Sequence, residues 1–278
     1  MTGTALSIAY GAKMHFWVFF FSMSTAILIQ LVSNLANDLG DMSKGTDTAA
    51  RLGPKRGMHA GLITAEQMKK AVIFMGVLSL LSGVVLIILA CRSLVDMLAF
   101  VCLGAVSLIA ALTYTMGKRA YGYYGFGDLS VLIFFGYAGV MGSFYLQTHQ
   151  IGLYSLLPAT ACGLLCALVL NVNNMRDVSE DAQNGKKTLA VRLGRNKIRY
   201  YHLALLIGSL LCLTLFACLF APHNPYIWLF LLALPLFYLN GYAVLSYREP
   251  AQLQSQLAVA IKINVFTLSL FSVGLFLN

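Results

Sequence analysis

The sequence predicts an all-α membrane protein, a polytopic bundle of eight full transmembrane helices preceded by one shortened helix. Of its 278 residues, 59% are hydrophobic and only 10% are charged, and the mean hydropathy is +0.77. A soluble domain is apolar over about half of its residues. Apolar stretches of about 20 residues, long enough to cross a bilayer, recur from one end of the chain to the other. We therefore expect a single transmembrane domain, residues 1–278, dissolved in the lipid bilayer.

The expected elements follow from these apolar stretches in order. Residues 2–10 are apolar but too few to span, so they predict the shortened first helix, and no basic segment precedes them as it would in a signal peptide. The eight expected transmembrane helices are residues 14–36, 68–91, 94–116, 128–147, 152–175, 199–221, 226–246 and 254–277.

Basic residues predict how the helices are oriented. Most of the 19 Lys and Arg residues lie in the connections that follow the spans ending near residues 36, 116, 175 and 246. Cytoplasmic loops carry such an excess of Lys and Arg, so we expect these connections to face the cytoplasm of a bacterial cell, across its inner membrane. The net charge of +9 is then a signal of topology, and we expect no nucleic-acid partner.

Two acidic motifs interrupt a chain that has only ten Asp and Glu residues. Each ends an apolar stretch, and each carries an Asn and two Asp residues three or four positions apart. If the helices continue through them, each trio projects from one helix face. Four spans separate the motifs, so both helices run in the same direction and both motifs open on the cytoplasmic side. The trios are Asn34, Asp38 and Asp41 in the first motif and Asn173, Asp177 and Asp181 in the second.

These trios predict a metal site. Oxygen donors suit Mg²⁺, which proteins hold with one or two carboxylates together with substrate phosphates and water. Polar helix ends and basic loops are common in membrane proteins, so either motif alone also fits an ordinary helix end. Two motifs on the same side of the membrane, with Lys and Arg close by, favour a site for a diphosphate bound with Mg²⁺. The expected diphosphate ligands are Arg51, Lys55, Arg56, Lys118, Arg119, Lys186 and Lys187.

The literal strings resemble a known family. The first is Asn34-Leu-Ala-Asn-Asp-Leu-Gly-Asp-Met-Ser-Lys-Gly-Thr-Asp47, followed by Arg51-Leu-Gly-Pro54 and Gly61-Leu-Ile-Thr64. Later strings are Tyr114-Thr-Met-Gly-Lys-Arg119, Gly125-Phe-Gly-Asp128, Asn173-Asn-Met-Arg-Asp177 and Gly185-Lys-Lys-Thr-Leu-Ala-Val-Arg-Leu-Gly194. Together they are similar to the signatures of the UbiA-type intramembrane prenyltransferases, over almost the whole chain. The Lys-Gly-Thr-Asp and Arg-Leu-Gly-Pro strings favour the branch that prenylates dihydroxynaphthoate.

The resemblance implies a nine-helix fold whose first helix is complete, whereas this chain begins part-way through that helix. It also implies Mg²⁺-dependent transfer of a polyprenyl group from a polyprenyl diphosphate to 1,4-dihydroxy-2-naphthoate, with loss of the carboxylate, in menaquinone biosynthesis. Asp38, Asp41, Asp177 and Asp181 would then be catalytic. Tyr114 would shield a positively charged allylic group with its ring, although Tyr at a helix end is also a common membrane anchor.

Two other functions remain alternatives. A UbiA-type enzyme of the 4-hydroxybenzoate branch would share the Asp spacing. An ion-coupled transporter would instead place its carboxylates deep in the bundle, break its helices at mid-span and carry inverted repeats. In this sequence the acidic residues cluster near helix ends, which favours the enzyme.

Overall fold

The computed structural model describes residues 1–45, 57–58 and 60–277, and in them the only regular secondary structure is helical. Eight helical segments are long and apolar enough to cross a membrane, so the predicted fold class and number of spans are confirmed. The predicted short first helix is also present, as α1 (Thr2–Ala9). The eight spans are Phe16–Ser43, Ala65–Ala90, Leu94–Thr113, Gly127–Thr148, Leu153–Arg176, Leu189–Phe220, Pro225–Ser246 and Pro250–Phe276.

Two boundaries differ most from the expectation, at the end of the second helix and at the start of α9 (Leu189–Phe220). The second helix runs from Phe16 to Ser43, seven residues beyond the expected end at 36, because polar side chains at its end do not prevent helical backbone bonds. The helix expected from residue 199 already begins at Leu189, with a kink at Gly194, whose φ of 68° lies in the left-handed region. Apolarity locates a membrane span, whereas the helix extends past it into the polar interface.

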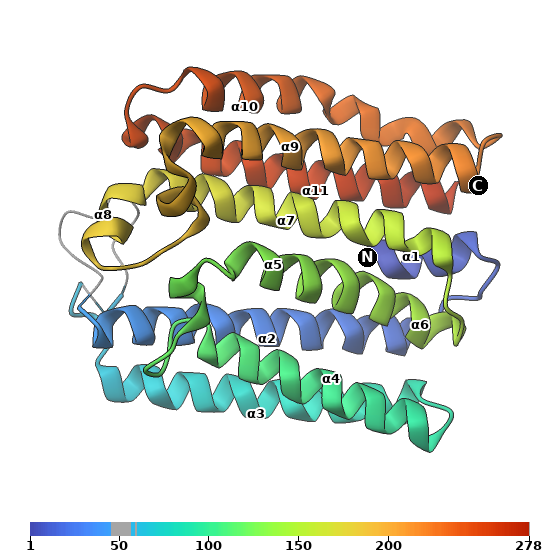
Figure 1. Cartoon of the computed structure of the whole chain (residues 1–278). Helices are drawn as coiled ribbons and strands as arrows, with labels where there is room; N and C mark the ends of the chain where they lie inside the picture. Colours follow the sequence, from blue (N-terminus) through green and yellow to red (C-terminus); the bar gives the residue numbers. More distant parts are fainter. Residues whose placement is uncertain (46–56, 59, 278) are drawn as a thin grey trace. The chain divides into compact units, whose positions relative to one another are not determined.

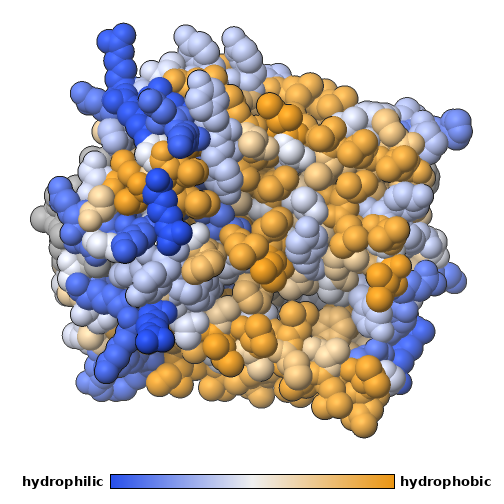
Figure 2. All heavy atoms as spheres, in the orientation of Figure 1, coloured by the Kyte–Doolittle hydropathy of each residue, from blue (hydrophilic) through white to orange (hydrophobic). Residues whose placement is uncertain are grey.

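The chain forms two compact units. The first consists of Met1–Met14, Asp128–Val178 and Leu189–Asn278, and the second of His15–Gly127 and Ser179–Thr188. Within each unit, apolar side chains cover the middle of the helices, and polar side chains gather at their ends (Figure 2).

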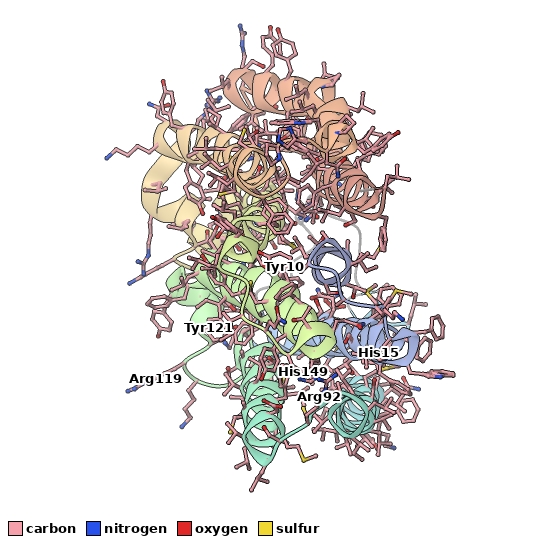
Figure 3. The ribbon with its side chains drawn as sticks, turned by 90° about the vertical axis from the view of Figure 1, so that its right-hand side faces the viewer. Tyr10, His15, Arg92, Arg119, Tyr121 and His149 are labelled. Carbon is pink, nitrogen blue, oxygen red and sulfur yellow. The ribbon has the colours of Figure 1, made fainter. Side chains whose placement is uncertain are left out.

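The second unit is built on three long helices. Its helices are α2 (Phe16–Ser43), α3 (Ala65–Ala90), α4 (Leu94–Thr113), the 3₁₀ turn η1 (Tyr121–Tyr124) and most of α8 (Val178–Gln183). Helix α2 packs against both α3 and α4 (Figure 1). Thr64 and Gln67 form a capping box at the start of α3, and the Ser93 side chain caps α4. His15 and Arg92 lie at the end of this unit that faces the viewer in Figure 3.

The first unit is organised around α7. Besides α1, its helices are α5 (Gly127–Val131), the π-helix η2 (Leu132–Met141), α6 (Gly142–Thr148), η3 (Leu153–Ser155), α7 (Leu156–Arg176), α9 (Leu189–Phe220), η4 (Pro225–Ala233), α10 (Leu234–Ser246), η5 (Pro250–Leu253) and α11 (Gln254–Phe276). Helix α7 packs against η2, α9 and α11. Its side chains, such as Leu165, Leu168 and Val172, form the centre of an apolar core.

Glycines allow α7 and η2 to approach closely. A Cβ atom at Gly136 would lie 2.6 Å from the carbonyl oxygen of Ala159 and 3.2 Å from the Cα atom of Gly163. Such small residues let membrane helices pack backbone to backbone. The fourth span is therefore held by a contact that tolerates no side chain at Gly136.

We expect Gly136→Ala to destabilise the protein, by about 1–3 kcal/mol as in other overpacked cores, because its methyl group would meet the Ala159 backbone. The check is the melting temperature in detergent. Gly104→Ala on α4 is the matched control, since a Cβ there meets nothing within 4 Å. Equal melting temperatures for the two variants would contradict the prediction.

Candidate active site

The first acidic motif lies on the last turns of α2. This helix is continuous through Ser43, so Asn34, Asp38 and Asp41 lie on one face, as expected from their spacing. Exposure falls along the face, from the exposed Asn34, which accepts a hydrogen bond from the Gln30 amide at 3.0 Å, to Asp41, which is only 6% exposed. The motif thus leads from the surface to a buried carboxylate.

Tyr123 and Lys186 both bind the carboxylate of Asp41. The hydroxyl of Tyr123 donates a hydrogen bond to its Oδ1 at 2.7 Å, and the ammonium of Lys186 lies 3.1 Å from the same oxygen. The Lys186 ammonium also lies 3.8 Å from the carboxylate of Asp181, which is buried as well. One lysine therefore joins a carboxylate of the first motif to a carboxylate of the second.

A cavity of about 260 Å³ lies beside this cluster. It is lined by Lys44, Lys118, Ala120, Tyr123, Tyr124, Gly185 and Lys187. Three lysines on one small cavity would suit an anion with several oxygens. The Tyr123 ring separates the cavity from the acidic cluster, with the ammonium groups of Lys44 and Lys186 lying 4.0 and 4.8 Å from its centroid.

The environment of Lys44 changes its acidity. Burial lowers the pKa of Lys44 from the ordinary lysine value, the Asp41 carboxylate opposes this shift, and the Lys186 ammonium adds to it. The charge of Lys44 is therefore coupled to both members of the neighbouring ion pair.

Backbone hydrogen bonds fix the cavity wall. After α8, Gly185 adopts a φ of 71°, and the backbone N–H of Lys186 donates to the Asp181 carbonyl at 2.8 Å. The N–H of Lys187 then donates to the carbonyl of Tyr123, also at 2.8 Å. The segment 179–188 is thus attached to η1 through its backbone as well as through its side chains.

The other wall depends on Thr115, just after α4. Its hydroxyl donates to the carbonyl of Ala36 and to the side chain of Asn37, at 3.2 and 3.0 Å, and its carbonyl accepts a hydrogen bond from Lys44 at 2.8 Å. Helix α2 can approach this closely because residue 40 is glycine, where a Cβ would lie 2.6 Å from the Thr115 hydroxyl. Thr115 therefore holds the acidic end of α2 and the cavity lysine together.

The second acidic motif begins in the first unit, at the end of α7. The helix ends at Arg176, close to the expected end at 175, and Asp177 follows with φ −93° and ψ 10°. The condition for a shared face, one continuous helix through Asn173, Asp177 and Asp181, is therefore not met. Arg176 forms a two-pronged ion pair with Asp177, at 2.6 and 2.7 Å. Its remaining N–H groups donate to Asn173 at 2.7 Å and to Gln254 at 3.0 Å.

Comparison with known proteins agrees with these motifs. A sequence model of the UbiA prenyltransferase family matches residues 1–270. The chain belongs to this family. Relatives named 1,4-dihydroxy-2-naphthoate octaprenyltransferase are 49% identical in Escherichia coli, over 100% of this chain and 90% of that one, and 44% identical in Haemophilus influenzae, over 98% and 91%. A Synechocystis 2-carboxy-1,4-naphthoquinone phytyltransferase is 27% identical over 76% and 66%.

The expected diphosphate ligands of this UbiA-family chain fall into four groups. Lys118 and Lys187 line the cavity, and Lys186 binds the two carboxylates. Arg119 is exposed, and its side chain points away from the helices of its unit (Figure 3). Arg51, Lys55 and Arg56 lie outside the described residues.

Tyr114 does not line the cavity of the UbiA-family chain. Its ring packs edge-on against Tyr121, with 5.3 Å between the centroids, and its carbonyl accepts a hydrogen bond from the N–H of Gly122. The cavity aromatics are instead Tyr123 and Tyr124.

Sequence reasoning missed three contributors to the site. Lys44 stands three residues after Asp41, just beyond the first motif, and Arg176 directly precedes Asp177. Their positions were visible, but only the fold shows which atoms they bind. Gln254, 78 residues from its partner Arg176, carries no local signal.

The Asp and Asn oxygens of this UbiA-family site suit Mg²⁺ only if a substrate supplies further oxygen ligands. Among residues 1–45, 57–58 and 60–277, no group of three or more His, Cys, Asp or Glu side chains could hold a metal ion by itself. Asp and Asn oxygens grouped in two motifs match a cation that takes one or two carboxylates and completes its shell with phosphate oxygens and water.

We expect Asp41→Asn to lower the pKa of Lys44 further, because the variant removes the carboxylate that opposes the effect of burial. Lys186→Met should raise it, because a neighbouring positive charge is lost. The measurement is the pH dependence of Lys44 acetylation, followed by mass spectrometry. Asp96→Asn, on the first turn of α4, is the control and should leave the midpoint unchanged. Shifts of the same sign in the first two variants would refute the coupling.

Proposed function

We propose that this UbiA-family chain transfers a polyprenyl group from a polyprenyl diphosphate to 1,4-dihydroxy-2-naphthoate, a step of menaquinone biosynthesis. The observation that carries the proposal is the three-lysine cavity beside the Asp41–Lys186–Asp181 cluster. The named activity of two relatives, similar along the full chain, supports the choice of acceptor.

The lysines of the cavity would hold the diphosphate. Lys44, Lys118 and Lys187 line one space, where their ammonium groups would bind the phosphate oxygens and stabilise the charge that develops on the leaving diphosphate. Arg51, Lys55 and Arg56 remain proposed ligands in the segment outside the described residues. Arg119, which points outward, would act only through its long-range charge.

UbiA prenyltransferases generally depend on Mg²⁺, which would supply a Lewis acid to the diphosphate oxygens. The residues that would hold it are Asn34, Asp38 and Asp41 of the first motif and Asn173, Asp177 and Asp181 of the second. Tyr123 and Lys186 orient the carboxylate of Asp41 for this role, and Arg176 orients that of Asp177.

In the proposed reaction, the bond between the allylic carbon and the diphosphate oxygen breaks, and the electron pair leaves with the diphosphate. The ring carbon that bears the carboxylate forms the new carbon–carbon bond. That carboxylate then leaves as carbon dioxide, its bonding pair returns to the ring, and demethylmenaquinol results. Tyr124, which lines the cavity, is better placed than Tyr114 to present an aromatic face to the allylic cation.

The chain is a multi-pass membrane protein, and we propose that it lies in the bacterial inner membrane with its site open to the cytoplasm. The distribution of charge within the second unit supports this orientation. Lys44 follows α2, Lys69 and Lys70 lie at the start of α3, and Lys118 follows α4, which places all four at the same end of these helices (Figure 1). Arg92 lies between α3 and α4, at the other end.

The decisive assay incubates the purified protein with a polyprenyl diphosphate and either 1,4-dihydroxy-2-naphthoate or 4-hydroxybenzoate, with Mg²⁺ or with EDTA. We expect a decarboxylated, prenylated naphthoquinol and free diphosphate, both only with Mg²⁺. Products are identified by chromatography and mass spectrometry. If neither acceptor gives a prenylated product, the proposed prenyltransferase activity is refuted. If only 4-hydroxybenzoate is used, the protein belongs to the 4-hydroxybenzoate branch.

Replacement of Asp38 or Asp177 by Asn should lower kcat by about 100-fold or more, the scale of losing one electrostatic contact to the transition state, and in Asp38→Asn the melting temperature should change little. Steady-state kinetics of detergent-solubilised protein measures the effect. The control is Asp96→Asn, which removes a carboxylate near Arg92, at the end of the second unit away from Asp41. Wild-type turnover in either motif variant would rule out the proposed metal ligands.

A further inference from the structure

Four polar side chains meet inside the membrane-spanning part of the first unit. They are Asn171 of α7, His202 of α9, Asn240 of α10 and Gln256 of α11. The first three are fully buried, with 0% exposure. None of the four belongs to the acidic motifs or the cavity, and the proposed reaction does not use them.

The four side chains form one chain of hydrogen bonds. Asn171 Nδ2 lies 3.2 Å from Nδ1 of His202, His202 Nε2 lies 2.8 Å from Oδ1 of Asn240, and Asn240 Nδ2 donates to Oε1 of Gln256 at 3.1 Å. An amide donor at Nδ1 and an amide acceptor at Nε2 together require a neutral imidazole with its proton on Nε2. His202 is thus the one member that connects α7 to α10 and, through Asn240, to α11.

Such a network fixes position more than it adds stability. Hydrogen bonds between membrane helices contribute modestly on average, because the separated helices also find partners. An unpaired polar group in the same apolar surroundings is costly, however. A shift of α7 along α9 would leave Asn171 and His202 unpaired, so the network selects one register of these helices.

The selected register reaches the second acidic motif by two routes. Along α7, Asn171 precedes Arg176 by five residues, or about 8 Å of helical rise. Along α11, Gln256 follows Gln254 by two residues, and Gln254 accepts a hydrogen bond from Arg176. Arg176 in turn holds Asn173 and Asp177. The network and the second acidic motif are therefore connected twice, once through α7 and once through the first turn of α11.

We propose that His202 is a positioning residue for the second acidic motif: by fixing α7 against α10 and α11, it sets where Arg176 presents Asn173 and Asp177. The role rests on the proposed function, because it is a role in binding the diphosphate donor. His202 itself contacts neither motif residue and acts through the helices.

The test compares two replacements of His202. Leucine approximates the size of the ring but makes no hydrogen bond, whereas glutamine offers an acceptor and a donor that can replace Nδ1 and Nε2. We expect His202→Leu to lower kcat/KM for the polyprenyl diphosphate by about 10- to 100-fold, as for other residues that orient ligands, with the KM for dihydroxynaphthoate unchanged. His202→Gln should recover most of the loss.

Ser209→Ala is the matched control. Ser209 is also fully buried on α9, two turns further along, but its hydroxyl donates to Leu206 of the same helix. A loss of donor kcat/KM as large in Ser209→Ala as in His202→Leu would overturn the proposal, as would equal defects in His202→Leu and His202→Gln. If His202→Leu does not fold, Gln256→Met tests the half-buried end of the network, and an unchanged donor kcat/KM there would also overturn the proposal.

A binding measurement separates this inference from the proposed function. The probe is a polyprenyl thiolodiphosphate, a slowly reacting analogue of the donor. It is titrated into the protein in the presence of Mn²⁺, and binding is measured by calorimetry. Affinity for it should fall about 10-fold or more in His202→Leu and recover in His202→Gln. If the wild-type protein binds the analogue but prenylates no naphthoate, the proposed function fails while the binding comparison still decides the role of His202.

Discussion

Carboxylates at the ends of membrane helices need cations, and the structure of this site follows from that constraint. A buried ionised carboxylate without a partner is costly. Asp41 and Asp181 share Lys186, and Asp177 forms a bidentate ion pair with Arg176. Because Lys186 follows α8 and Asp41 ends α2, pairing these charges also determines where the segment 179–188 lies.

Two kinds of charged group lie close together in the second unit. The carboxylates of Asp41 and Asp181 bind Lys186, and Lys44, Lys118 and Lys187 line the adjoining cavity. A region of carboxylates beside a region of lysines matches a substrate that consists of a divalent cation and a polyanion. The two regions are held at a fixed separation because Tyr123 contacts both, through its hydroxyl, its ring and its backbone carbonyl.

Much of this could be predicted from the sequence, for identifiable reasons. Eight spans follow from apolarity alone, and the Asn and Asp spacing placed Asn34, Asp38 and Asp41 on one helix face correctly. The second motif was harder, because spacing assumes a continuous helix and Asp177 ends one. Partners far apart in sequence, such as Lys186 and Asp41 or Arg176 and Gln254, depend on how helices pack, and Arg119 shows that a basic residue in the right loop can still point outward.

The attachment of residues 179–188 to η1 has a consequence for how the protein can vary. The backbone N–H of Lys187 donates a hydrogen bond to the carbonyl of Tyr123. The ammonium of Lys186 lies over the Tyr123 ring and binds Asp41, the carboxylate that also accepts the Tyr123 hydroxyl. A segment transplanted from a relative would therefore keep its conformation only if the recipient supplied a tyrosine at the equivalent of position 123. The two stretches, η1 and residues 179–188, lie more than 50 residues apart in sequence but depend on each other structurally. Chimeric enzymes should therefore exchange them together.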